Sequence, residues 1–329
     1  MSPPLLAPFL SPRDLTICFA HVAYQMEATF ARRATGIRHF QVWSRQELAE
    51  RLPEADVLVV SGFWQNSLLD NAPRLRFIQS IGAGVDQFDQ PALRARGIRL
   101  ANASGVNRNA VSEHAIACIL ALARQLHTGR DNQRQHIWRG MISDLSQRED
   151  ELGGKTLLIV GLGAIGSRLA KLAKAFDMRV IATKRNPATV TGVADEVHTP
   201  DRLLNLLPQA DFVALTCPLT AETTNLIDDT AFDVMKPNAY LINMARGRCV
   251  DEPALLTALQ DGTIAGAAID HFWDEPLPAD SPFWDVKNLL ITPHTAGETR
   301  MYEANVVDIL LENLGRLGES KEELRNQVV

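Results

Sequence analysis

Three predicted strands in the second half of the chain are followed by side chains that can bind an anion or move a proton. Arg246, Glu275 and His294 each come shortly after such a strand. A guanidinium binds oxyanions, an imidazole exchanges a proton near neutral pH, and a carboxylate can orient the imidazole. Ligands of an open parallel sheet bind at the carboxyl ends of its strands, so we expect one shared site. Taken singly, each residue could instead be a surface ion-pair partner or an ordinary turn residue.

A glycine-rich turn, GLGAIG at 161–166, stands between a buried apolar run and a helical stretch. Gly161 permits a tight turn, Gly163 lets the backbone approach a pyrophosphate, and Gly166 allows close packing of helix on strand. The helix N-terminus then presents free N–H groups to the anion. This context predicts binding of a dinucleotide, whereas the motif alone would be a weak signal.

The strand after the glycine turn ends in cations rather than in an acid. Lys184 and Arg185 stand about 20 residues beyond the turn, where an NAD-specific site has a carboxylate for the ribose hydroxyls. Two cations suit a 2′-phosphate, so the sequence predicts that NADP(H) is preferred and that NAD(H) is possible. The alternative is that both side chains are solvated at the end of a strand.

Two series of alternating apolar and polar segments predict parallel sheets with helices on their faces. In the first series the predicted strands are Leu15–Phe19, Phe40–Trp43, Val57–Val60, Phe77–Ile81 and Ile98–Ala101, and the predicted helices are Gln46–Arg51 and Pro91–Arg96. In the second series the strands are Thr156–Val160, Arg179–Thr183, Asp211–Leu215, Ala239–Asn243, Ala265–Ile269 and Leu289–Ile291, and the helices are Ile165–Phe176, Asp201–Leu207, Glu252–Gln260 and Glu298–Leu317.

The segments before and after the second series differ in composition: the first is apolar and the second is charged. The run from Asn109 to Arg124 is rich in Ala, Leu and Ile and has no internal glycine or proline, which predicts a long, mostly buried helix. The tail 318–329 is charged, and we expect it to be loosely held.

Composition excludes several classes of protein. With 329 residues, 46% hydrophobic and 22% charged, the chain is long enough for two globular domains. A net charge of −6 disfavours nucleic acid or an anionic membrane as partner. The four cysteines have no CxxC spacing and are expected to be buried thiols in a reducing compartment. The apolar start lacks the basic residues of a signal peptide, and no segment is long enough to span a membrane, so a cytoplasmic location is expected.

Taken together, these segments resemble the D-2-hydroxyacid dehydrogenase family. Further matching stretches are SIGAGVDQFD at 80–89, GVNRNAVSEH at 105–114 and CPLTAETTNLI at 217–227. The resemblance runs from about Ser61 to Gly297. Within it, Glu275 follows Arg246 by 29 residues and His294 follows Glu275 by 19, as the family pattern requires.

The resemblance implies an oxidoreductase that transfers a hydride between NAD(P)H and a small 2-keto or D-2-hydroxy acid. Arg246 would bind the substrate carboxylate and carbonyl, because its planar fork of donors fits both. His294 would give a proton to the carbonyl oxygen in reduction and take it back in oxidation. Glu275 would orient the imidazole and favour its protonated form. No metal is required for this chemistry, and no ligand cluster at zinc spacing is visible in the sequence.

The family pattern also assigns contacts with coenzyme and substrate. The expected coenzyme-binding residues are Gly161, Gly163, Ala164, Ile165, Gly166, Lys184, Arg185, Cys217, Pro218, Met244, Ala245, Arg246, Asp270, His294, Ala296 and Gly297. The expected substrate-binding residues are Ala83, Gly84, Val85, Arg246 and His294.

Some residues keep two interpretations. Trp64 could line the substrate site or pack in a core, and Asn107 could border the substrate. Glu113 and His114 belong to the family's helix motif and are expected to serve structure at the hinge between domains. Thr216-Cys217 stands where many relatives have His-Leu before PLT, and Cys217 would then line the coenzyme pocket. FWDEPLPADSPFW, from Phe272, resembles the glyoxylate and hydroxypyruvate reductase branch.

The implied fold is α/β, with two Rossmann-like, doubly wound parallel-sheet domains and the active site in the cleft between them. A coenzyme domain, 107–297, would be inserted into a substrate domain formed by 1–106 plus 298–329. A homodimer through the coenzyme domain is expected, with 109–150 as the arm. The alternatives are an NAD(H)-sensing corepressor-like binding protein of the same fold, or a phosphoglycerate-type dehydrogenase. The latter is disfavoured because the substrate loops show no cluster of cations and the chain ends without a regulatory domain.

Overall fold

The computed structural model describes residues 14–189, 192–319, 321 and 323–329 and divides the chain into two compact units. Unit 1 consists of the chain up to Asn107 together with Thr299–Val329, and unit 2 is Arg108–Glu298. These boundaries lie within a residue or two of those expected for an inserted domain. Which unit holds coenzyme and which holds substrate stays a prediction. None of the described helices has the length and apolar character needed to cross a membrane.

Unit 1 is built on a five-stranded parallel sheet in the order β2-β1-β3-β4-β5. Its central strands are buried along their whole length, as expected of a parallel sheet covered on both faces. The strands are β1 Thr16–Ala20, β2 Arg38–Val42, β3 Val57–Val60, β4 Phe77–Ser80 and β5 Arg99–Ala101, and the helices are α1 Met26–Ala31, α2 Arg45–Arg51, α3 Gln90–Ala95 and α10 Tyr302–Gly318.

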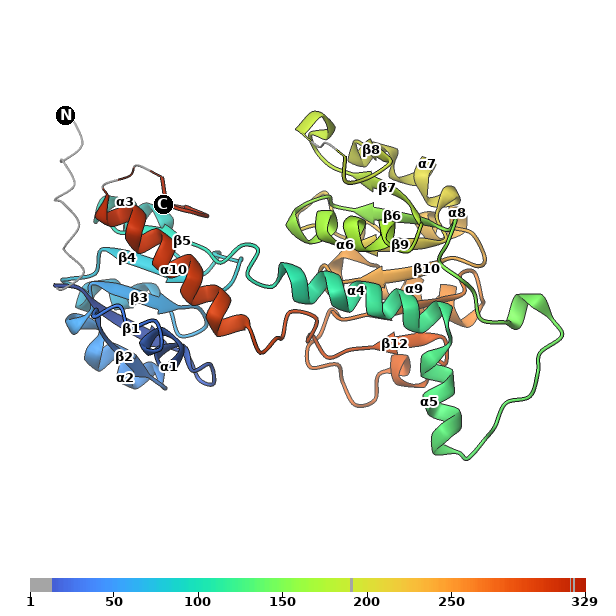
Figure 1. Cartoon of the computed structure of the whole chain (residues 1–329), viewed down its shortest axis with the longest axis horizontal. Helices are drawn as coiled ribbons and strands as arrows, with labels where there is room; N and C mark the ends of the chain where they lie inside the picture. Colours follow the sequence, from blue (N-terminus) through green and yellow to red (C-terminus); the bar gives the residue numbers. More distant parts are fainter. Residues whose placement is uncertain (1–13, 190–191, 320, 322) are drawn as a thin grey trace. The chain divides into compact units, whose positions relative to one another are not determined.

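Helix α10 returns the chain to unit 1 and completes its core (Figure 1). Its buried face, which includes Val306, Leu310 and Leu317, packs in one cluster with residues of β1, β3 and β4. The segment after α10 corrects the expectation of a loose tail. Leu324 is buried, Gln327 forms an antiparallel bridge with Ala101, and backbone hydrogen bonds join Leu100 to Val328 and Val329. The described end of the chain therefore covers the exposed edge of β5.

Unit 2 contains a seven-stranded parallel sheet in the order β12-β11-β10-β9-β6-β7-β8. The order reverses between β6 and β9, which is the doubly wound topology. The strands are β6 Thr156–Val160, β7 Arg179–Thr183, β8 Glu196–His198, β9 Phe212–Leu215, β10 Tyr240–Asn243, β11 Gly266–Ile269 and β12 Leu289–Ile291, and the helices are α4 Arg108–Ala123, α5 Leu126–Arg134, α6 Ala164–Lys174, α7 Leu203–Leu206, α8 Asp229–Val234 and α9 Glu252–Gln260. The two α/β domains with all-parallel sheets confirm the predicted fold class.

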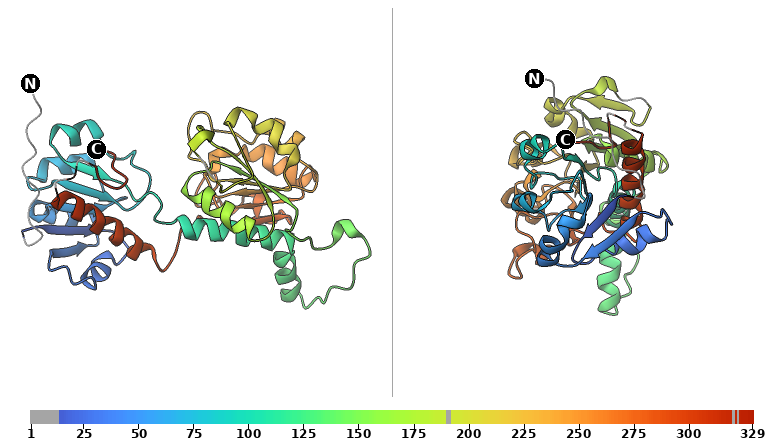
Figure 2. Two further views of the ribbon diagram at one scale, coloured as in Figure 1. Left: turned by 45° about the horizontal axis from the view of Figure 1, so that its top comes forward. Right: turned by 90° about the vertical axis from the view of Figure 1, so that its left-hand side faces the viewer.

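The long helix α4 and the segment that follows it differ sharply in burial. Helix α4 packs against α6, β10 and β11 and is buried over much of its length, as predicted. Helix α5 and the irregular chain up to about residue 150 then project away from the body of unit 2 (Figure 2). Of the region 109–150 expected to form an arm, only residues 126–150 project in this way, and from here on we call these residues the arm. Its large apolar side chains are strongly exposed: Trp138 is 97% exposed and Met141 is fully exposed.

All four cysteines are free and buried, which confirms the expectation for their packing. Burial raises the pKa of Cys18 and of Cys118 to about 12, so both thiols stay protonated near neutral pH.

Candidate active site

The glycine turn lies at the carboxyl end of β6, beside the end of β9, where the strand order reverses. Gly161 has φ +102°, and a Cβ on it would lie 2.7 Å from the Cα of Cys217. A Cβ on Gly166 would lie 2.5 Å from the carbonyl oxygen of Gly161. A Cβ on Gly163 would instead meet nothing within 4 Å, and Gly163 is the N-cap residue of α6. Two glycines are thus required by packing, and the third leaves open space above a helix N-terminus.

Lys184 and Arg185, the two cations expected near the coenzyme's ribose, lie directly after β7. The amide of Lys184 donates to the carbonyl of His198 at 2.9 Å, which keeps the chain in register with edge strand β8 at this point. The side chain of Lys184 is half-buried and that of Arg185 is exposed. Both cations therefore stand at the carboxyl edge of the sheet that carries the glycine turn.

Arg246 is presented by a tight turn after β10. The side-chain amide of Asn243 donates to the carbonyl of Arg246 at 3.0 Å and its oxygen accepts from the amide of Ala245 at 3.0 Å. The next residue, Gly247, packs so closely on the backbone of Phe272 that a Cβ there would clash. This close approach brings the loop after β10 against the loop after β11. The exposed guanidinium donates to the carbonyl of Ala245 at 2.7 Å.

Asp270 is a buried anchor for the loop that carries His294. It is 1% exposed, and its Oδ1 accepts from the hydroxyl of Thr292 at 2.6 Å and from the amide of Thr295 at 2.9 Å. The amide of Ala296 donates to the same carboxylate. Because the Thr292 hydroxyl donates to Asp270, it accepts from Nε2 of His114 at 3.1 Å. His114 thus ties α4 to this loop, which supports a structural role.

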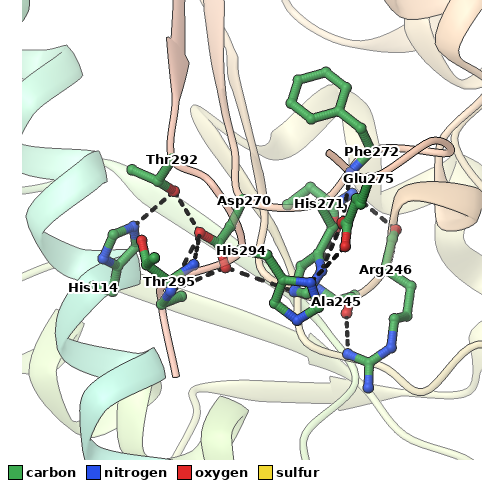
Figure 3. A network of polar contacts seen from close by, with 12 residues as sticks. His114, Ala245, Arg246, Asp270, His271, Phe272, Glu275, Thr292, His294 and Thr295 are labelled. Atoms are coloured by element: carbon green, nitrogen blue, oxygen red, sulfur yellow. Dashed lines mark hydrogen bonds and ion pairs between the residues drawn. The ribbon is translucent and has the colours of Figure 1, made fainter. Parts of the chain in front are cut away.

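His294 and Glu275 form a short polar contact at the centre of the site (Figure 3). Nδ1 of His294 lies 2.6 Å from Oε2 of Glu275. An ionised carboxylate can only accept, so Nδ1 carries the hydrogen and Nε2 is left for another partner. The other carboxylate oxygen accepts from the amide of Phe272 at 3.1 Å. Burial alone would raise the pKa of Glu275, but these hydrogen bonds and the charge of His294 outweigh it, so its pKa is lowered.

His271 is a residue of this site that sequence reasoning did not single out. It is 6% exposed, and its ring lies edge-on to that of His294, with 4.0 Å between centroids. Burial, followed by the charge of His294, lowers the pKa of His271 to about 4, so this imidazole is neutral near pH 7. Its place directly after Asp270 and four residues before Glu275 was the available signal. That spacing alone does not reveal which way the ring points.

The remaining predicted residues divide between the units. Met244, Ala245 and Ala296 are buried beside the site in unit 2, whereas Pro218 is exposed and Gly297 half-buried. Ala83, Gly84 and Val85 lie in unit 1, in the loop after β4, where the first two are exposed.

Trp64 is a core residue of unit 1. It is 5% exposed, packs against Phe88 and donates from Nε1 to Asn66. This supports the packing interpretation of Trp64 rather than the substrate-site one.

Comparison with known proteins agrees with this geometry. Residues 116–296 match the NAD binding domain of the D-isomer specific 2-hydroxyacid dehydrogenases. The glyoxylate reductase of Pyrococcus furiosus is 35% identical over 82% of this chain and 81% of its own length. The chain belongs to the D-isomer specific 2-hydroxyacid dehydrogenase family. Its matched region includes the glycine turn, Arg246, Glu275 and His294, so the family's nicotinamide coenzyme is supported here.

Other relatives show how broad the family is. The D-3-phosphoglycerate dehydrogenase of Mycobacterium tuberculosis is 36% identical over 78% of this chain, which spans about half (48%) of that protein's length. Among solved structures, a family member from Aeromonas salmonicida is 31% identical with a TM-score of 0.81, covering 97% of this chain and 99% of the other. A D-lactate dehydrogenase from Treponema pallidum is 25% identical with a TM-score of 0.80, covering 95% and 99%.

Proposed function

We propose that this dehydrogenase reduces a small 2-keto acid to the corresponding D-2-hydroxy acid, with His294 as the proton donor. The observation that carries the proposal is the 2.6 Å contact between Nδ1 of His294 and Glu275, which leaves Nε2 for a substrate oxygen. The pair lies at the carboxyl edge of the sheet that carries the glycine turn. Substrate pockets of doubly wound sheets form at that edge.

The coenzyme in this proposal is NADP(H), with NAD(H) as a weaker alternative. The open space above Gly163 and the free N-terminus of α6 fit a pyrophosphate. Lys184 and Arg185 would bind the 2′-phosphate, since no carboxylate follows β7 to repel it. The bound nicotinamide would supply the hydride. The expected contact from Asp270 to the coenzyme stays a prediction, because its carboxylate already accepts from three neighbouring groups.

The side chains of unit 2 then have distinct tasks. Arg246 would bind the carboxylate and carbonyl of the keto acid and stabilise negative charge on the oxygen as the hydride arrives. His294 would donate its Nε2 proton to that oxygen. Glu275 remains ionised because its pKa is lowered, so it would stabilise the imidazolium before transfer and hold the ring afterwards. In the oxidative direction the same imidazole would take the proton back.

Unit 1 carries the other residues proposed to bind substrate. The loop formed by Ala83, Gly84 and Val85 follows β4 in unit 1, and backbone amides there would bind oxygens of the substrate carboxylate. This assignment rests on the family pattern.

Glyoxylate or hydroxypyruvate is the substrate class that we propose. Relatives named glyoxylate reductase match more than four fifths of both chains, as in Pyrococcus furiosus and Thermococcus litoralis. A phosphoglycerate-type activity is the second candidate, because relatives of that name reach 36% identity.

A substrate panel with both coenzymes tests the proposal. Loss of NADPH or NADH absorbance would be followed with glyoxylate, hydroxypyruvate, pyruvate and phenylpyruvate, and oxidation would be assayed with D-3-phosphoglycerate. We expect turnover of a small 2-keto acid, faster with NADPH, and a product of D configuration where the product is chiral. Absence of turnover in the whole panel would contradict the proposal and favour an NAD(H)-sensing binding protein.

The arm supports a homodimer as the working assembly. Ile137, Trp138, Met141 and Leu145 are all more than half exposed. Large apolar side chains that are exposed within one segment point to an interaction surface. We propose that the arm packs on a second copy of the chain. A cytoplasmic location stays a prediction.

A further inference from the structure

The site contains a third potential metal ligand that the proposed reaction does not use. His271, Glu275 and His294 each offer one ligand atom, and these three atoms lie within 4.8 Å of one another. Nδ1 of His271 is 3.5 Å from Oε1 of Glu275, and Nδ1 of His294 is 2.6 Å from Oε2. Two imidazole nitrogens and a carboxylate therefore lie close enough together to hold one ion.

The chemistry of these donors selects a class of ion. Imidazole and carboxylate are ligands of Zn²⁺, Co²⁺, Ni²⁺ and Cu²⁺, whereas Mg²⁺ and Ca²⁺ take oxygen ligands. Three protein ligands also leave a coordination position for water, as in open zinc sites.

The ring of His271 has a carboxylate behind it, at ion-pair rather than hydrogen-bond distance. Nε2 of His271 lies 3.7 Å from Oδ2 of Asp270, and both side chains are almost fully buried. A carboxylate behind the ring orients a metal-binding histidine and leaves the other nitrogen facing the ion. Here that other nitrogen is Nδ1, the one that faces Glu275.

The opposite side of the cluster is open to solvent. The side chains of Glu275 and His294 are 34% and 53% exposed, so an ion can enter from that side. On binding it would take the place of the hydrogen on Nδ1 of His294, release that proton to solvent, and end the hydrogen bond to Glu275.

We propose that His271, Glu275 and His294 form an inhibitory site for a divalent transition metal of the Zn²⁺ class. The inhibitory part rests on the proposed function, since the ion would occupy the imidazole that donates the proton. His271 is the residue that turns a proton-transfer pair into a three-ligand site.

Metal titration of the full chain, free of any polyhistidine tag, tests the site without relying on activity. Co²⁺ is expected to bind with one equivalent and give the visible absorption of a low-coordinate nitrogen and oxygen site, and calorimetry with Zn²⁺ should give the same stoichiometry. His271→Gln should weaken Zn²⁺ binding at least about tenfold. His271→Phe, which keeps a ring packed on His294, should do the same and serves if the first variant does not fold. His198→Gln, which alters the half-buried His198–Glu196 pair on β8, is the matched control and should leave Zn²⁺ binding unchanged.

Inhibition is measured separately with a 2-keto acid that the enzyme turns over. Zn²⁺ should inhibit the unmodified enzyme, a chelator should restore its activity, and His271→Gln should need at least about ten times more Zn²⁺ for the same inhibition. Absence of one-equivalent binding, or binding unchanged by both His271 variants, would overturn the metal site even if the enzyme is active. A chain that binds Co²⁺ as described but reduces no 2-keto acid would retain the metal site and overturn the proposed function.

Discussion

His294 holds its position through a backbone conformation that residues other than glycine seldom adopt. Its φ is +54°, in the left-handed region, and its amide donates to the carbonyls of Asp270 and Thr292. The turn therefore aims the imidazole at Glu275, and a replacement must tolerate the same backbone. Asparagine is a side chain that does so comparatively well.

For this reason, His294→Asn separates proton transfer from folding. We expect kcat for 2-keto acid reduction to fall at least about 100-fold, the usual contribution of a general acid. NADPH affinity and the melting temperature should stay close to those of the unmodified enzyme. Steady-state kinetics, coenzyme fluorescence titration and thermal unfolding give the three readouts. Unchanged turnover would remove His294 from the mechanism.

Lys184 is the residue at which coenzyme preference can be tested. Lys184→Asp replaces a cation after β7 with the carboxylate of an NAD-type site. The ratio of kcat/KM for NADPH to that for NADH should fall roughly tenfold or more, equivalent to about 1.4 kcal/mol. Lys287→Asp makes the same charge change before β12, at the opposite end of the strands, and should leave the ratio unaltered. Equal ratios in all three proteins would mean that Lys184 only faces solvent.

Substitutions at two glycines of the strand–turn–helix element around Gly161 distinguish a role in packing from a role in coenzyme binding. Gly166→Ala forces a Cβ against the carbonyl of Gly161, and overpacking of this kind costs about 1 to 3 kcal/mol of unfolding free energy. Gly163→Ala meets nothing within 4 Å, so stability should change by less than about 0.5 kcal/mol. Coenzyme affinity should nevertheless fall for Gly163→Ala, because the methyl group fills the space proposed for the pyrophosphate.

Urea unfolding and coenzyme titration of the two glycine variants distinguish these effects. A Gly163→Ala protein that binds NADPH normally would show that the pyrophosphate does not approach Gly163. A Gly166→Ala protein of normal stability would contradict the packing argument instead.

Strands were predictable from sequence where burial alone decides their composition. Val57–Val60, Thr156–Val160 and Arg179–Thr183 have the predicted bounds, because an apolar run between polar or glycine residues marks a strand buried in a sheet. Edge strand Leu289–Ile291 also has the predicted bounds, since it too is an apolar run. Edge strand β8, with the polar sequence Glu-Val-His, carries no such run and was not predicted. The short helices α1 and α8 were also missed.

The site was predictable as a set of residues but not as an arrangement. Arg246, Glu275 and His294 follow strands that are neighbours in the sheet, so their meeting follows from the topology. The position of His271 between Asp270 and Glu275 depends on how the loop after β11 folds back, at the place where Phe272 packs on Gly247. The pairing of the tail with β5 likewise depends on contacts far apart in sequence. Helix α10 starts at Tyr302, four residues later than predicted.

At the scale of the whole molecule, the arm predicts the oligomeric state. Trp138→Glu combined with Met141→Glu places two charges in the apolar surface of the arm, and desolvating them would be costly in an interface. We expect light scattering to give the mass of a dimer for the unmodified protein and of a monomer for the double variant. Leu204→Glu, at an exposed apolar position on α7, should remain dimeric. A monomeric unmodified protein would contradict the proposal.

The return of the chain to unit 1 has a consequence for how the protein is made. Chains emerge from the ribosome N-terminus first, and domains fold as units once their segments are available. All of unit 2 leaves the ribosome before α10, although the sheet of unit 1 was synthesised earlier. Without α10, the apolar face formed by β1, β3 and β4 is covered only in part, by α1. Unit 1 therefore cannot complete its core until the residues from Thr299 onward have been translated. Until then its incomplete core is accessible to chaperones and proteases.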